Sequence, residues 1–221
     1  MTSAGPVTGS VHARARTARH PAPGVVAALA LLPGGCGPGA PAALPADLSD
    51  LPITVVAADA TPAATPAAPP AGDAPLPFVI LFSGDGGWAP LVDGISHRLA
   101  AAGVPVVGVS SQKYFWDERE PDVIARDIAR IAARYSALWG RTRFALAGFS
   151  FGADAVPFAV PLLDAADRAD LDALVLISPL RDADFEFHVS SWWNRGDTGV
   201  PIAPEMAKLG TLPVEIGRAH V

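Results

Sequence analysis

The sequence has a single cysteine, Cys36, among 221 residues. One thiol excludes an internal disulfide framework and a cysteine-based zinc cluster. Basic residues are also few, 16 against 22 acidic ones, which gives a formal net charge of −6. Because nucleic-acid binding needs a positive face, this balance argues against nucleic acid as a partner. No feature of the sequence requires a metal ion or another cofactor, and we expect neither.

The N-terminal region lacks an apolar run long enough to span a bilayer. Residues 24–32 (GVVAALALL) are nine apolar residues, whereas a membrane-spanning helix needs about 20. The run follows three arginines and precedes Gly34-Gly35-Cys36, an order typical of a secretory leader. It resembles a bacterial lipoprotein signal, in which the cysteine is lipidated, although Pro33 departs from that pattern. Cleavage nearby with a free Cys36 is the alternative. We expect residues 1–36 to be a signal peptide, and the protein to be periplasmic or anchored through Cys36 and facing the periplasm.

The segment from 37 to 77 contains little that could build a core. It begins with a Gly/Pro-rich tether, and residues 58–77 are low-complexity Ala/Pro sequence, which predicts an extended linker. Between them, residues 51–56 (LPITVV) are typical of a short strand. The hydrophobic fraction of the whole chain, 50%, is nevertheless too high for a disordered protein.

Residues 78–214 alternate between strand and helix patterns. Continuous apolar runs predict buried strands over residues 78–82, 104–109, 144–147 and 174–177, and Leu212 begins another. Helical spacing predicts helices over 91–102, from Pro121 to Gly140, and over 153–163. The expected apolar stripes are Leu91, Ile95 and Leu99 in the first helix, and Ile124, Ile128, Ile131, Tyr135 and Leu138 in the second. This alternation predicts an α/β fold with a mostly parallel sheet covered by helices on both faces.

The last seven residues, 215–221 (EIGRAHV), are unusual. Codons that encode this string are similar to a common sequencing adapter, so we interpret the segment as an artefact; a genuine basic tail is the alternative. On the first interpretation the α/β domain, 78–214, is incomplete. We then expect this chain alone to be inactive and prone to aggregation, because a truncated sheet has an unpaired edge.

Two glycine-rich loops follow predicted strands. In Gly148-Phe149-Ser150-Phe151-Gly152, a G-x-S-x-G string connects a buried strand to a helix. This context is typical of a nucleophile elbow, which presents a serine hydroxyl above the sheet. Ser150 is therefore the predicted nucleophile, and an incidental serine in a glycine-rich turn is the alternative. Because the residue after the nucleophile contributes an oxyanion N–H in such sites, we assign that role to Phe151.

The second loop, Ser83-Gly84-Asp85-Gly86-Gly87-Trp88, directly follows the strand 78–82. In α/β-hydrolases the loop at this point supplies the other oxyanion N–H, which we assign to Asp85. A phosphate-binding loop is the alternative, but the G-x-x-x-x-G-K-[ST] pattern is absent.

The combined motifs resemble the VirJ/AcvB family of exported bacterial proteins. The resemblance runs in order from residue 82 to 192. It comprises FSGDGGW at 82–88, GVPVVGV at 103–109, YFW at 114–116, the helix with Asp127, GFSFGAD at 148–154, PF at 157–158, DFEFHV at 184–189 and Trp192. The resemblance implies an α/β-hydrolase fold and a periplasmic serine hydrolase. It further implies removal of the aminoacyl group from lysyl-phosphatidylglycerol, and an association with type IV secretion and virulence.

The remainder of a catalytic triad is not evident. In the resembled family the acid and the histidine follow the strand that begins here at Leu212, so both would lie beyond this chain. His97 precedes the nucleophile and is expected on the surface. His188 is interpreted as a pocket-wall or structural residue, with a general-base role as the lesser option. Asp182 and Asp184 could serve as acids in a variant arrangement.

Other residues could contact substrate. Asp154, one helical turn after Ser150, could attract a cationic headgroup or hold a neighbouring loop, and we favour the second role. Asp85 has the same two options. Four tryptophans could line an acyl-chain pocket or pack in the core, namely Trp88, Trp116, Trp192 and Trp193.

Three functional classes remain open. The first is a serine hydrolase that acts on a phospholipid or a small ester. The second is a non-catalytic exported accessory protein that binds secretion components. The third is a generic carboxylesterase of the same fold, which differs from the first only in its substrate. A histidine after the last strand of the full-length protein would favour catalysis.

Overall fold

The sheet that organises the molecule contains six strands in the order β1-β3-β2-β4-β5-β8. The computed structural model describes residues 47–58, 76–186 and 199–218. In chain order, the strands are β1 (Ile53–Val56), β2 (Phe78–Phe82), β3 (Val106–Val109), β4 (Phe144–Phe149), β5 (Leu171–Ile177) and β8 (Val214–Gly217). All neighbouring pairs are parallel except β1 with β3, which are antiparallel. The expected mostly parallel sheet is thus confirmed.

The central strand β2 consists of five apolar residues, and all of them are buried. Such continuous burial is typical of a parallel strand that is covered on both faces. Its neighbours, β3 and β4, are buried almost throughout. The apolar runs therefore identified the central strands correctly, although β4 and β5 extend beyond the predicted ranges.

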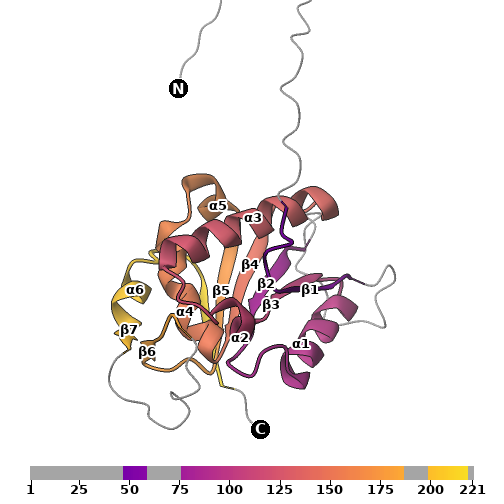
Figure 1. Cartoon of the computed structure of the whole chain (residues 1–221). Coiled ribbons are helices and arrows are strands. Elements are labelled where there is room, and N and C mark those ends of the chain that lie inside the picture. The colour runs from indigo at the N-terminus through magenta and orange to yellow at the C-terminus, as the bar shows by residue number, and fades with distance from the viewer. Residues whose placement is uncertain (1–46, 59–75, 187–198, 219–221) are drawn as a thin grey trace, which may run out of the picture. The chain divides into compact units, whose positions relative to one another are not determined.

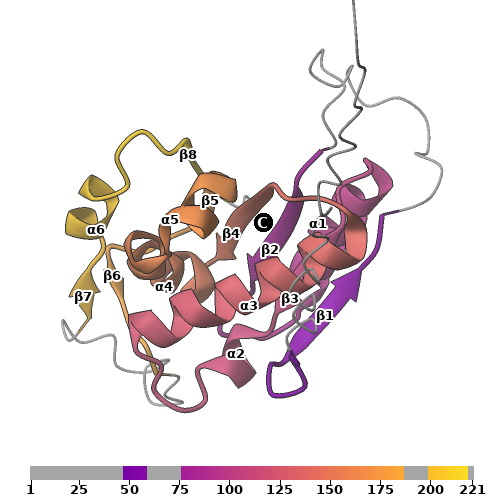
Figure 2. The same ribbon diagram turned by 90° about the horizontal axis from the view of Figure 1, so that it is seen from above.

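Two helices cover one face of the sheet, α3 (Pro121–Trp139) and α4 (Phe151–Ala159), and α4 continues into a 3₁₀ turn, η1 (Val160–Leu162). Figures 1 and 2 show α3 lying across the central strands. Proline is the first residue of α3, and Gly140 ends it with a φ of 63°, as the sequence predicted. Of its predicted stripe only Leu138 is wrong: its side chain is 59% exposed because it lies in the last turn.

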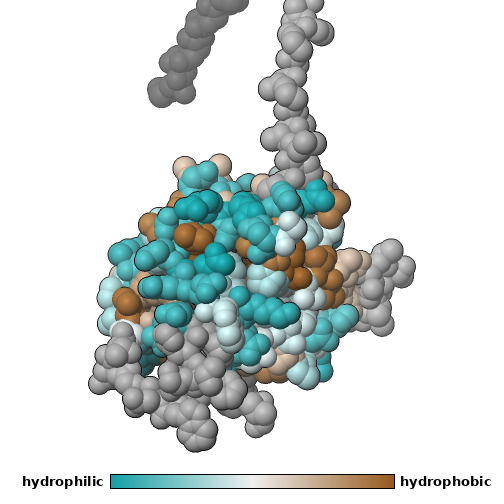
Figure 3. Space-filling view, viewed as in Figure 1, coloured by the Kyte–Doolittle hydropathy of each residue, from teal (hydrophilic) through white to brown (hydrophobic). Residues whose placement is uncertain are grey.

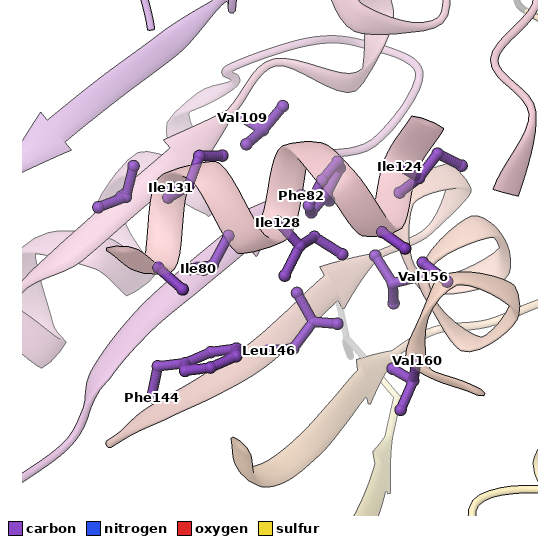
Figure 4. Close-up of a cluster of buried hydrophobic side chains, with 14 of the residues drawn as sticks. Ile80, Phe82, Val109, Ile124, Ile128, Ile131, Phe144, Leu146, Val156 and Val160 are labelled. Atoms are coloured by element: carbon purple, nitrogen blue, oxygen red, sulfur yellow. The ribbon is translucent and has the colours of Figure 1, made fainter. Parts of the chain in front are cut away.

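The main core lies between this face of the sheet and the two helices. Figure 4 shows Ile124, Ile128 and Ile131 of α3 pointing toward strand residues such as Ile80, Phe82 and Leu146, with Val156 and Val160 beside them. Each of these side chains is almost completely buried. Burying a side chain of this size stabilises the fold by about 1.5–3 kcal/mol, so this cluster holds α4 against the sheet.

The opposite face carries α1 (Pro90–Ala101). It packs through Val92 and Ala100 against Val79, Leu81 and Val106. The predicted stripe is correct in part: Leu99 packs against this cluster, but Leu91 is 45% exposed, and the fully buried positions are Val92, Ser96 and Ala100. Ser96 can be buried because its hydroxyl donates to the Val92 carbonyl, at 2.8 Å. The face of α1 that meets the sheet thus combines the small residues Ser96 and Ala100 with Val92 and Leu99.

Five short elements were not predicted. They are α2 (Ser111–Tyr114), α5 (Ala165–Asp170), α6 (Ala203–Ala207) and the two-stranded pair β6 (Asp182–Ala183) and β7 (Val200–Pro201). One of them had a local signal, since the Asp164 carboxylate accepts from the N–H groups of Ala166 and Asp167 at the start of α5. The face shown in Figure 3 is mainly hydrophilic, with isolated apolar groups.

The last strand, β8, pairs with β5 from Val214 to Gly217. It therefore includes residues 215–217, which the sequence-based interpretation placed outside the folded domain as part of an artefact. Cys36, most of the Ala/Pro-rich linker, His188, Trp192, Trp193 and His220 lie outside the described residues. None of the described helices is long and apolar enough to cross a membrane.

Candidate active site

Ser150 lies at the sharp junction between β4 and α4. Its backbone adopts φ 50° and ψ −120°, a region that residues other than glycine rarely enter and that costs about 1–3 kcal/mol. The hydroxyl does not cap the helix that it precedes. The Ser150 N–H donates to the Ile177 carbonyl on the neighbouring strand, at 2.8 Å. This combination of strain and fixation is the geometry of a nucleophile elbow.

The two glycines of the motif are required by close backbone contacts. A Cβ atom at Gly148 would lie 2.6 Å from the backbone of Ala153 in α4. A Cβ atom at Gly152 would lie 2.5 Å from the Ser83 carbonyl oxygen and 2.6 Å from that of Phe82. Real Cβ contacts are not this short, so the helix can approach both strands only because these residues lack side chains. The steric reason for G-x-S-x-G is therefore visible on both sides of Ser150.

The backbone at the start of α4 lies directly beside Ser150. The first N–H groups of a helix have no acceptor within it, and their partial positive charge favours a nearby anion. Gly152 donates to the Ser83 carbonyl, at 3.1 Å, and Asp154 to the Ser150 carbonyl, at 3.1 Å. Phe151 is the first residue of the helix and directly follows Ser150; the oxyanion role of its N–H stays a prediction.

The loop after β2 approaches Ser150 directly. A Cβ atom at Gly84 would lie 3.4 Å from Cβ of Ser150 and 3.2 Å from the ring of Phe149. The loop then makes a turn in which the Gly87 N–H donates to the Gly84 carbonyl, at 3.0 Å, with Gly87 at a φ of 71°. Asp85 follows Gly84 in this turn and is partly exposed. The two predicted oxyanion residues thus come from the loop after β2 and from the start of α4, which contact each other.

Asp154 is buried on α4, with 3% of its surface exposed. Its Oδ1 accepts from the Leu180 N–H, at 2.6 Å, so it links the helix to the segment that follows β5. Sequence reasoning offered loop attachment or headgroup binding for this residue, and the geometry gives the carboxylate a partner in the loop. No local sequence pattern predicts Leu180 as that partner, because the two residues are 26 positions apart.

Trp88 packs against β3. Its indole Nε1 donates to Asp93, at 3.0 Å, and its ring lies against Gly108, where an added Cβ would be 2.0 Å from the ring. The side chain belongs to the cluster under α1. Of the two options given by the sequence, Trp88 thus takes core packing in this structure. Trp116 is 61% exposed.

The Phe151 side chain packs at the end of a row of aromatic rings. Phe115 packs edge-on against Phe151, with ring centroids 5.0 Å apart, and against Tyr114, at 4.9 Å. The Tyr114 hydroxyl donates to the buried Asp127 carboxylate, at 2.7 Å. Burial and this carboxylate together raise the pKa of Tyr114 far above its ordinary value, so the phenol stays protonated as a donor. Arg130 binds the other Asp127 oxygen, at 2.8 Å.

The described residues do not place a general base beside Ser150. His97 is the one histidine in the described ranges; it is exposed on α1, 3.8 Å from Asp93, in agreement with its expected surface position. Asp182 and Asp184 follow β5 and are exposed. His188 was the other internal candidate, and it lies outside the described ranges. Among the residues that the structure describes, no group of three or more His, Cys, Asp or Glu side chains could hold a metal ion.

A cavity of about 510 Å³ lies next to the end of β5. Leu176, Leu180 and Ile202 are among its apolar lining residues, and Asp182 is among its charged ones. Ser150 does not line it. The cavity nevertheless borders the segment that Asp154 holds, so its position is fixed by the same helix that carries the elbow.

Comparisons with known proteins agree with this architecture. Residues 77–216, more than half of the chain, match the family model described as bacterial virulence protein (VirJ). No curated protein sequence matches the chain. The elbow, the loop after β2 and the sheet order together constitute an α/β-hydrolase fold, which confirms the predicted fold class.

Three solved structures illustrate the similarity. Est1E from Butyrivibrio proteoclasticus is 18% identical, with a TM-score of 0.46, and the match covers 64% of this chain and 66% of that one. A hyperthermophilic esterase from Pyrobaculum calidifontis is 23% identical, with a TM-score of 0.36, and the match covers 65% of this chain and 49% of that one. LpqC, a poly(3-hydroxybutyrate) depolymerase from Bordetella parapertussis, is 19% identical, with a TM-score of 0.35, and the match covers 64% of this chain and 54% of that one. The chain spans less than two thirds of each structure, and identities this low do not indicate a shared activity.

Proposed function

The chain belongs to the VirJ family of bacterial virulence proteins, and from this membership and the geometry around Ser150 we propose that it is a serine hydrolase acting on an ester or aminoacyl ester. The observation that carries the proposal is the strained backbone of Ser150, φ 50°, between two glycines that contact neighbouring backbone. Strain of this kind persists only where surrounding structure enforces it. Substrates of such folds bind at the carboxyl ends of the parallel strands, and Ser150 lies at that end of β4.

The proposed reaction has two steps. The Ser150 oxygen attacks the ester carbonyl carbon, and the carbonyl π electrons move onto the oxygen. The N–H groups of Asp85 and Phe151 stabilise that oxyanion. Collapse expels the alcohol, which takes up the proton removed from Ser150, and leaves an acyl-serine. Water then attacks this ester and releases the acid. The base is a histidine, which the family resemblance assigns to a position after β8; His188 is the internal alternative.

The substrate we propose is lysyl-phosphatidylglycerol, in which lysine is esterified to a glycerol hydroxyl. Support comes from the family resemblance, and the elbow supplies the acyl-transfer chemistry that the reaction needs. The test is to incubate the full-length protein with vesicles containing this lipid and to measure release of free lysine. A matched uncharged ester reports general esterase activity. Hydrolysis of the model ester alone would indicate a generic carboxylesterase, and a folded protein without either activity would favour the non-catalytic accessory role.

Substitutions of Asp154 distinguish a role in headgroup recognition from a role in attaching the loop. Asp154→Asn retains an oxygen that can accept from Leu180 but removes the charge. Because Asp154 is buried and bonded to this loop, we expect the ratio of kcat/KM between lysyl-phosphatidylglycerol and the uncharged ester to stay within about twofold. Asp154→Ala removes the acceptor of the Leu180 N–H, on a residue that is 53% exposed, and should lower the unfolding free energy by about 1 kcal/mol. A tenfold fall in that ratio for Asp154→Asn would instead show that the carboxylate recognises the ammonium group.

For location, we propose export with a lipid anchor on Cys36 facing the periplasm. The Gly/Pro-rich residues after Cys36 would let the catalytic domain reach phospholipid headgroups. Recovery in the membrane fraction should fall strongly in Cys36→Ser, because a hydrophobic anchor contributes about 0.8 kcal/mol per buried methylene group. Unchanged membrane recovery would contradict lipidation, and a protein confined to the cytosol would contradict export.

A further inference from the structure

The residue that connects the two halves of the candidate site is Ser83, the first residue after β2. It is completely buried. Its backbone N–H donates to the Val109 carbonyl on β3, at 2.9 Å, and its carbonyl accepts from Gly152 at the elbow, at 3.1 Å. Ser83 thus joins β2, β3 and the start of α4 through its main chain alone.

The Ser83 side chain makes two further bonds. Its Oγ accepts from the Ser111 N–H, at 2.9 Å, and donates to the Gly84 carbonyl, at 3.2 Å. The same carbonyl accepts from the Gly87 N–H, at 3.0 Å. Two donors therefore restrain the orientation of the Gly84 carbonyl.

The Gly84 carbonyl and the Asp85 N–H belong to the same peptide unit, and the Asp85 N–H is the proposed oxyanion donor. A trans peptide is planar, with its C=O and N–H on opposite sides. Fixing the Gly84 carbonyl toward the buried Ser83 hydroxyl consequently fixes the Asp85 N–H in the opposite direction. Gly84 itself lies against Ser150, so this peptide is held beside the nucleophile.

From this geometry we propose that Ser83 is a positioning residue, whose hydroxyl aims the Asp85 N–H at the oxyanion. The inference rests on the proposed hydrolase activity, and it gives the Ser83 hydroxyl a role beyond those already assigned to the two glycine-rich loops. Without the hydroxyl, the Gly84–Asp85 peptide loses one of its two restraints and can rotate. Misplacing an oxyanion donor weakens an interaction that is made mainly in the transition state, so kcat should fall while KM changes little.

The test compares Ser83→Ala with Ser96→Ala in the full-length protein. Ser96 is a matched control, because it is equally buried but donates to a carbonyl within α1. We expect Ser83→Ala to reduce kcat for an uncharged ester about 10- to 100-fold, with KM within about threefold. Ser96→Ala should keep both parameters within about twofold.

A second measurement is independent of how much of each variant folds. Each protein is given an oxygen ester and the corresponding thionoester, whose C=S group becomes a weaker hydrogen-bond acceptor in the transition state. The ratio of the two kcat/KM values cancels the active fraction. The preference for the oxygen ester should fall about tenfold in Ser83→Ala and stay unchanged in Ser96→Ala.

An unchanged ratio in Ser83→Ala would overturn the positioning role, even if stability or overall rate declined. The proposed function itself fails in a different way, namely when the wild-type protein hydrolyses neither ester or when Ser150→Ala retains the activity. The two failures are therefore distinguishable in one set of experiments.

Discussion

Replacing Ser150 with alanine should reduce ester hydrolysis by the full-length protein by roughly 10³-fold or more, because removal of a nucleophile eliminates the covalent step. The fold should remain intact. The Ser150 main-chain bond to Ile177 does not involve the hydroxyl, and the hydroxyl does not cap α4. The measurement is kcat/KM for a model ester, together with a thermal unfolding midpoint.

Ser178→Ala is the matched control for this variant. Ser178 follows the neighbouring strand β5 and, among the residues that the structure describes, is the other serine with a positive φ, 54°. No helix follows it directly, so it lacks the elbow geometry, and we expect most of the activity to remain. Equal losses in the two variants would indicate that both hydroxyls support the site structurally and that Ser150 is not the nucleophile.

Gly152→Ala should lower both stability and activity severely. The new Cβ would meet the carbonyl oxygens of Ser83 and Phe82 at 2.5 and 2.6 Å, and backbone of a buried strand cannot yield as a flexible side chain does. Overpacking of this kind costs about 3 kcal/mol. Because α4 must move away from β2, the Phe151 N–H moves with it, and a displacement near 1 Å can cost about 100-fold in rate. Chemical denaturation and kcat/KM check the two effects.

Gly94→Ala is the control for a glycine in a helix. Gly94 lies within α1, and a Cβ built there meets nothing within 4 Å. Alanine should therefore stabilise the protein by about 0.5–1 kcal/mol, since it restricts the unfolded chain and favours the helix. If Gly152→Ala behaved like Gly94→Ala, the close crossing of α4 over β2 would be wrong.

Local sequence signals were sufficient for the parts of the fold that depend on local chemistry. The apolar run Phe78–Phe82 predicted a strand buried on both faces. Pro121 and Gly140 delimited α3 because their backbone preferences act at single positions. The glycines around Ser150 predicted the elbow for the same reason. These features required no knowledge of which distant residues meet.

Features that arise from distant contacts could not be predicted in this way. Trp88 packs on Gly108, and its position in a loop cannot specify that partner. The stripe predicted for α1 was correct only in part, because Val92, Ser96 and Ala100 occupy its most buried positions. Ser83 went unnoticed as an individual residue, since its hydroxyl bonds to Ser111, 28 positions away. Such partners are set by the order of β2 and β3 in the sheet.

The most direct test of the central claim, that Ser150 is an activated nucleophile, is covalent labelling with a fluorophosphonate followed by mass spectrometry of the peptides. We predict a single adduct on Ser150 in the full-length protein, absent from Ser150→Ala and retained in Ser178→Ala. Because the reagent reacts with a serine only where a base and an oxyanion site activate it, the adduct would report the assembled site. A folded protein that is labelled at another serine, or at none, would contradict the account.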